Sequence, residues 1–126
     1  MNIGIDGDGF IKVQMPSGEA AYTRKGILSL NANKQLVIGN NLVLGENGPI
    51  TLTSTDVAID SRGIIHNIAG DRVGTLKITT FNQPYPLEKA GETLFVAKDG
   101  SVELPSTAEV RQQYLEESNV SSLSSM

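Results

Sequence analysis

Apolar residues occur in short runs from Ile3 to about Leu104, and turn-forming residues separate these runs. Glycine, proline, asparagine and aspartate fill the gaps at spacings near those of a β-sandwich or a β-barrel. Alternation with a period of two indicates half-buried strands and does not suit an amphipathic helix. The sequence therefore predicts a mainly β protein with a single β-rich domain, built as a sandwich or an irregular barrel of short hairpins.

Three pairs of runs have the pattern of β-hairpins. In the first pair, Ile11 and Val13 alternate with other positions up to a turn that contains Pro16 and Gly18. In the second pair, Asn33 is expected to adopt the left-handed conformation that closes the turn. The paired runs are residues 10–15 with 21–24, 27–30 with 35–38, and 57–59 with 64–68.

Further extended segments are expected at residues 42–44, 50–53, 94–97 and 102–104. The longest strand candidate covers residues 73–81, where β-branched threonines stand between Val73, Leu76 and Ile78. We expect this strand in the centre of the sheet. Proline cannot donate a ladder hydrogen bond, so Pro105 is expected to end the strand-rich part.

The composition changes after residue 105, because residues 108–118 are polar and contain no glycine. A stripe of apolar side chains with a spacing of three follows, and this spacing predicts one face of a helix. The apolar residues of the stripe are Val120, Leu123 and Met126. Ser118 or Asn119 would be the N-cap residue of this helix. Two helical turns are too short to be stable alone. We therefore divide the chain into a β-rich domain, residues 1–105, and an extended segment leading into a truncated helix, residues 106–126.

Composition and charge narrow the classes of function. The 126 residues contain 10 Lys and Arg against 14 Asp and Glu, a net charge of -4, which does not favour nucleic acid as a partner. The absence of cysteine excludes disulfides, thiolate metal sites and a cysteine nucleophile. The N-terminus lacks the pattern of a cleaved signal peptide, and no window approaches the ~18 apolar residues of a membrane span. We expect no membrane insertion, and any export would use a route without a cleaved signal.

The sequence holds two weak candidates for chemistry. Asp6 and Asp8 alternate with glycines as in a calcium loop, but Ser17 stands where the bidentate glutamate of such a loop belongs. His66 is the only histidine, and one histidine without a cysteine or a nearby carboxylate pair makes neither a triad nor a zinc site. We therefore predict no catalytic residues, no metal, no cofactor and no enzyme activity.

Three sets of segments, in order along the chain, resemble the bacterial flagellar rod and hook family, and most closely its rod proteins. The first set starts with the acidic-glycine turn before Phe10, followed by a Tyr-Thr-Arg-x-Gly pattern that begins at Tyr22. It departs from the family at Lys34, where glycine is common. The matching segments are residues 5–13 with 22–33, then 44–50 with 73–78 and 87–95, and finally 114–120.

The resemblance implies a structural subunit of the flagellar basal-body rod, with the proximal type favoured by residues 45–50. Such a subunit self-assembles with other axial proteins of the rod and hook type into the hollow drive shaft used for motility. The resemblance places it in the periplasmic rod, reached by type III export without a cleaved signal peptide. It also implies that residues 111–117 are extended.

In the resembled proteins, terminal helices pair in the inner wall of the tube, and the β-domain forms the next shell outward. We therefore expect this chain to be a fragment without the N-terminal helix and without the end of the C-terminal helix. Val120, Leu123 and Met126 would then belong to an assembly helix that needs a partner helix.

A second interpretation is a small calcium- or carbohydrate-binding β-module of a surface fibre. Its support is the turn with Asp6 and Asp8. Aromatic residues make up only 5% of the chain and tryptophan is absent, so a platform for stacking sugars is poorly supplied.

Overall fold

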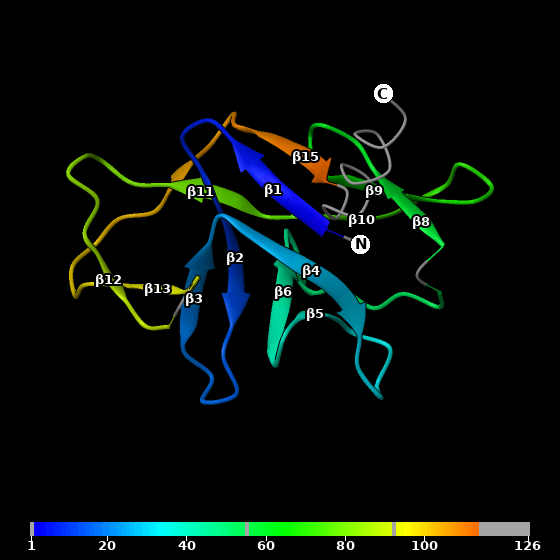
Figure 1. The fold of residues 1–126 in the computed structure, drawn as a ribbon, viewed down its shortest axis with the longest axis horizontal. Coiled ribbons are helices and arrows are strands. Elements are labelled where there is room, and N and C mark those ends of the chain that lie inside the picture. Colours follow the sequence, from blue (N-terminus) through cyan, green and yellow to red (C-terminus); the bar gives the residue numbers. More distant parts are fainter. Residues whose placement is uncertain (1, 55, 92, 114–126) are drawn as a thin grey trace, which may run out of the picture.

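The computed structural model describes residues 2–54, 56–91 and 93–113, and every helix or strand element assigned within them is a β-strand (Figure 1). The strands are β1 (Asn2–Asp6), β2 (Phe10–Gln14), β3 (Ala20–Thr23), β4 (Lys25–Leu30), β5 (Leu36–Ile38), β6 (Asn41–Gly45), β7 (Gly48–Pro49), β8 (Val57–Ile59), β9 (Ile64–Asn67), β10 (Arg72–Thr75), β11 (Ile78–Thr80), β12 (Leu87–Lys89), β13 (Phe95–Ala97), β14 (Leu104–Pro105) and β15 (Glu109–Gln113). The prediction of a mainly β fold is confirmed. The predicted helix start at residues 119–126 lies outside the described residues.

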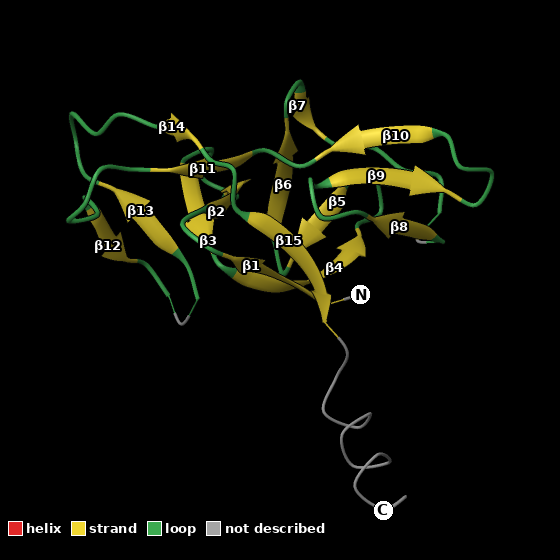
Figure 2. Cartoon of the chain, turned by 90° about the horizontal axis from the view of Figure 1, so that it is seen from above, coloured by secondary structure: helices red, strands yellow, loops and turns green. Residues whose placement is uncertain are grey.

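Most strands belong to one curled sheet, in the order β12-β13-β3-β2-β6-β5-β4-β1-β15 (Figures 1 and 2). β11 joins this sheet through β2 and β14, and β7 joins it through β6. All of its strand pairs are antiparallel, and short turns join the pairs that are consecutive along the chain, such as β2 with β3 and β4 with β5.

A smaller sheet, in the order β10-β9-β8, lies at the end of the molecule away from β12 and β13 (Figures 1 and 2). Backbone hydrogen bonds fasten it to the larger sheet: Val110 N donates to Ser61 O at 2.9 Å, and Glu46 N donates to Thr75 O at 3.3 Å. The approach at the second contact is close, since a Cβ on Gly45 would lie 2.7 Å from the Thr75 carbonyl oxygen. Gly45 therefore allows the two sheets to meet.

The three predicted hairpins are confirmed as β2 with β3, β4 with β5, and β8 with β9. The conformation of one turn was predicted wrongly. Lys34, and not Asn33, has a positive φ of 66°. The reason is Asn31, whose side-chain oxygen accepts hydrogen bonds from the backbone N–H groups of Asn33 and Gln35 and so displaces the left-handed position by one residue.

The long central strand predicted at residues 73–81 is wrong. The segment splits into β10, at the edge of the small sheet, and β11, in the large sheet, while Leu76 between them forms an isolated bridge with Gly45. A bulge between Arg72 and Gly74 leaves Val73 without a cross-strand partner. The segment thus serves two sheets, with β10 at the edge of the small sheet and β11 between β2 and β14 in the large one.

The end of the strand-rich part also differs from the prediction. The extended segments expected at residues 94–97 and 102–104 belong to different strand pairs, since β13 pairs with β12 and β3, whereas β14 pairs with β11. Pro105 lies within β14 and does not end the sheet, because β15 follows and pairs with β1. The extended conformation expected from residue 111 onward is confirmed up to Gln113.

The core has two parts. The larger part is aliphatic, and its least exposed side chains include Ile3, Ile11, Val13, Val43 and Ile65. The smaller part is aromatic: Phe10, Tyr22 and Phe81 are buried, and Tyr85, Leu87 and Phe95 pack against them half-buried. The aromatic rings meet edge to face, as between Tyr22 and Phe81 with centroids 5.0 Å apart.

Candidate functional site

Arg24 joins the two halves of the first family-like segment. Its guanidinium donates to the carbonyl oxygens of Gly7 at 2.6 Å, Gly9 at 2.8 Å and Ile5 at 3.2 Å. Its Cζ also lies 5.7 Å from the centre of the Phe10 ring. The arginine of the Tyr-Thr-Arg pattern therefore holds the acidic-glycine turn against the end of β3.

Asp8 in the same turn is occupied by hydrogen bonds. One carboxylate oxygen accepts the hydroxyls of Tyr85 and, at 2.8 Å, of Thr80. These two bonds, that of Tyr85 first, lower the pKa of Asp8 below its ordinary value. Ser106 donates to the Asp8 carbonyl at 2.7 Å, and a Cβ on Gly9 would lie 2.5 Å from the same hydroxyl oxygen. The turn is therefore packed against residues near the C-terminal strand.

A second polar cluster lies around Glu103, which the sequence did not single out. The carboxylate accepts a hydrogen bond from Tyr22 and lies 2.6 Å from Lys12 Nζ and 3.9 Å from Lys77 Nζ. Burial acts to raise the pKa of Glu103, but the bonds from Lys12 and Tyr22 outweigh it and lower that pKa. Burial and the contact with Glu103 raise the pKa of Tyr22. This cluster fastens the segment before β14 to β2 and β3.

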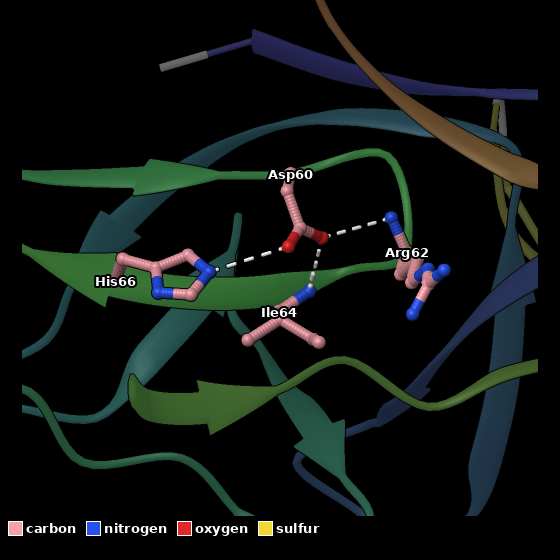
Figure 3. Close-up of polar contacts among 4 residues, drawn as sticks. All are labelled: Asp60, Arg62, Ile64 and His66. Atoms are coloured by element: carbon pink, nitrogen blue, oxygen red, sulfur yellow. Dashed lines mark hydrogen bonds and ion pairs between the residues drawn. The ribbon is translucent and has the colours of Figure 1, made fainter. Parts of the chain in front are cut away.

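His66 lies in β9, near a turn, and faces Asp60 (Figure 3). His66 Nε2 is 3.2 Å from Asp60 Oδ2, while Asp60 Oδ1 accepts the backbone N–H of Arg62 at 2.8 Å and of Ile64 at 3.1 Å. The bond from Ile64 is the main cause that lowers the pKa of Asp60. The arrangement closes the β8–β9 turn, and no nucleophile is part of it.

The pairing of β1 with β15 brings the two ends of the described chain to one edge of the large sheet (Figures 1 and 2). The register runs from Asp6 opposite Glu109 to Asn2 opposite Gln113. At the end of this pairing where Asp6 lies opposite Glu109, the Arg111 guanidinium is 3.2 Å from the Asp6 carboxylate and 2.8 Å from the Glu109 carboxylate. Gln113, the last described residue, therefore lies beside the start of β1.

Each of these clusters joins segments that lie far apart in the sequence or closes a turn. Among the described residues, no group of three or more His, Cys, Asp or Glu side chains is arranged to hold a metal ion. In the same part of the chain, no helix is long and apolar enough to cross a membrane. Asp6 and Asp8 do not converge on one point, since Asp6 pairs with Arg111 and Asp8 with Thr80 and Tyr85.

Comparison with known proteins identifies the family to which this fold belongs. Residues 4–67 match the family model described as the flagellar hook protein FlgE/F/G D1 domain. The chain belongs to this family. The matched residues include Arg24 and the acidic-glycine turn that it holds, here called the Arg24 junction. The resemblance of the sequence to the rod and hook family is thereby confirmed.

Individual members of the family support the same placement. The chain is 31% identical to the flagellar basal-body rod protein FlgG of Buchnera aphidicola subsp. Baizongia pistaciae, over 94% of this chain and 50% of the relative. It is 30% identical to FlgG of Caulobacter vibrioides, over 98% of this chain and 52% of the relative. It is also 33% identical to the rod protein FlgF of Salmonella typhimurium, over 52% of this chain and 26% of that protein.

The chain spans about half the length of the FlgG relatives that it matches. These relatives are named as flagellar basal-body rod proteins. The site residues predicted from the sequence, Asn119, Val120, Leu123 and Met126, lie outside the described residues. Arg24 stands in the Tyr-Thr-Arg pattern, but its role in holding the acidic-glycine turn was not predicted from the sequence. Its place in that pattern was the only signal for the role.

Proposed function

We propose that this chain is part of a structural subunit of the bacterial flagellar basal-body rod. Membership of the FlgE/F/G D1 family carries the proposal, and the named FlgG and FlgF relatives support it. The subunit would self-assemble with other axial proteins of the rod and hook type into a hollow shaft. Its place in the periplasmic rod, its export without a cleaved signal peptide and the proximal type belong to the same proposal.

The edge formed by β1 and β15 supports the proposed placement of the terminal helices. Asn2 lies opposite Gln113, so the two ends of the described chain lie side by side. Helices attached at these two points would begin side by side, as an inner wall of paired helices requires. The β-domain would then lie outside that wall as the next shell.

The calcium- or carbohydrate-binding module is not favoured. Asp8, the residue that suggested calcium, accepts hydrogen bonds from Thr80 and Tyr85 and takes part in closing the fold. Calcium requires six to eight oxygen ligands. The relatives are named as rod proteins, and nothing in those names points to a ligand.

A substitution at Leu123 in the full-length protein tests the proposal. If Val120, Leu123 and Met126 form a buried helical seam, Leu123→Asp places an unpaired carboxylate in it, at a cost of several kcal/mol. Bacteria that carry this variant as their only copy should lose swimming motility, measured in soft agar. The purified 126-residue chain with the same change should melt within about a degree of the parent, because the substitution lies outside the β-domain.

Ser121→Asp is the matched control, because residues two apart on a helix point in nearly opposite directions. It adds the same charge on the other face and should leave motility intact. Full motility of the Leu123→Asp strain would refute the assembly helix. Motility of a strain that lacks this gene product would overturn the proposed rod function as a whole.

A further inference from the structure

The loop between β9 and β10 carries an exposed apolar tip. Ile68 is 82% exposed in this loop, and Val73, the unpaired residue of the β10 bulge, is 37% exposed. They are two of the four large apolar residues that are exposed in the described part of the chain. Half of this exposed apolar set thus lies on one hairpin.

An apolar hollow lies beside the aromatic part of the core. Its lining includes Phe10, Tyr85, Leu87 and Phe95, together with Asp8 and Arg24, and its volume is about 570 Å³. Tyr85, Leu87 and Phe95 are only half-buried. Their free faces are available to another apolar side chain.

The tip and the hollow belong to opposite ends of the long axis of the molecule. The β9–β10 loop projects at one end, and β12 and β13, which supply Leu87 and Phe95, lie at the other (Figures 1 and 2). A tip of this kind cannot reach the hollow of its own chain. It can reach the hollow of a second copy placed further along the same axis.

We propose that the β9–β10 tip of one copy, with Ile68 at its centre, inserts into the hollow lined by Tyr85, Leu87 and Phe95 of the next copy. This inference rests on the proposed rod function and names a contact through which subunits would follow one another. The contact joins two different surfaces, so it is heterologous, and it builds an open filament when the rotation between successive copies does not close a ring.

The contact depends on apolar burial, because the charged groups of the hollow already have partners within the chain. Arg24 donates to three backbone carbonyl oxygens, and Asp8 accepts from Thr80 and Tyr85. A single hairpin tip buries far less than the roughly 1,200 Å² of a stable interface, so the contact is weak alone and becomes effective when it repeats along a filament.

Oxidative cross-linking of the 126-residue chain tests the contact, because the chain has no cysteine of its own. The double variant Ile68→Cys with Leu87→Cys, oxidised at high protein concentration, should give a ladder of dimers, trimers and larger species on a non-reducing gel. Each single variant has one thiol and can form only dimers. A ladder reports tip-to-hollow contact when peptide mass mapping finds the disulfide between the thiol at position 68 and the thiol at position 87, and not between two copies of the same position.

The matched control is Ile27→Cys with Leu87→Cys, because Ile27 is also an exposed isoleucine, at 59%, but lies in β4. It should give no ladder. Without any substitution, the amide NMR signals of the tip and those of Tyr85 and Leu87 should shift together as the protein is concentrated.

The contact is overturned if the double variant gives no more large species than the control, or if the two sets of signals stay fixed with concentration. These readouts do not depend on motility. If the ladder forms and the Leu123→Asp strain swims normally, the tip-to-hollow contact is supported and the assembly helix is refuted. If that strain loses motility and no ladder forms, the assembly helix is supported and the tip-to-hollow contact is refuted.

Discussion

Ile5 of β1 lies directly opposite Val110 of β15, and both side chains are buried. The pair joins the first described strand to the last one. Val110 also donates its backbone N–H to Ser61 of the small sheet, at 2.9 Å. One position in the last strand thus connects the N-terminal strand, the aliphatic core and the second sheet.

Val110→Asp should therefore destabilise the β-domain strongly. Val110 is 3% exposed, and an unpaired carboxylate at such a position costs several kcal/mol. Gln112→Asp is the control, because Gln112 is exposed two positions further along the same strand. Urea unfolding followed by circular dichroism should show a large loss for the first variant and a change within about 0.5 kcal/mol for the second. Similar midpoints would show that β15 adds little to stability.

Arg24→Met should destabilise the chain by about 2 kcal/mol or more. The change keeps an apolar stem but leaves the carbonyl oxygens of Gly7 and Gly9 without their charged donor, and bonds to charged groups contribute about 1.5–3 kcal/mol each. Arg62→Met, at an exposed position in the β8–β9 turn, is the control. Urea midpoints of the two variants provide the comparison, and equal midpoints would exclude a structural role for the Arg24 junction.

Stability should fall when the pH drops below about 4. Hydrogen bonds lower the pKa of Asp8 and of Asp60 in the folded state below the ordinary 3.8. A lowered folded-state pKa gives stability that is present above the ordinary value and is lost as the pH falls through the folded value. The double variant Asp8→Asn with Asp60→Asn should flatten this acid limb, whereas Asp99→Asn, in an exposed turn, should keep it. Unfolding curves over the acid range measure the slopes, and parallel slopes would refute the assignment.

Lys34→Gly should stabilise the protein by up to about 1 kcal/mol. Lys34 has a φ of 66°, where a residue with a Cβ is strained by roughly 1–2 kcal/mol, and the greater backbone freedom of unfolded glycine offsets part of the gain. Lys34→Ala keeps the Cβ and should give no such gain. A thermal melt of both variants tests the difference, and a lower melting temperature for Lys34→Gly would contradict it.

Local features of the fold could be predicted from the sequence, because each hairpin is encoded by adjacent residues. Ile11 and Val13 alternate with partly buried neighbours, and the turns after them contain glycine or asparagine. The resemblance to the family also rested on contiguous segments. These signals do not depend on how distant parts of the chain meet.

Long-range pairings could not be predicted in this way. The pairing of β15 with β1 and the division of residues 73–81 between two sheets depend on contacts between segments far apart in sequence. The bulge at Val73 gives no sign in an apolar pattern that otherwise suits one strand. The Glu103 cluster was missed for the same reason, since Lys12 and Tyr22 lie many residues earlier.

The pairing of the first described strand with the last also decides when this domain can finish folding. A ribosome releases β1 early and β15 last, and closing such a long loop slows folding because the entropy loss precedes the contacts that compensate for it. Until residues 109–113 emerge, β1 has a partner only in β4, and its other edge stays open. The sheet of a nascent chain therefore remains incomplete at this edge until residues 109–113 have been synthesised.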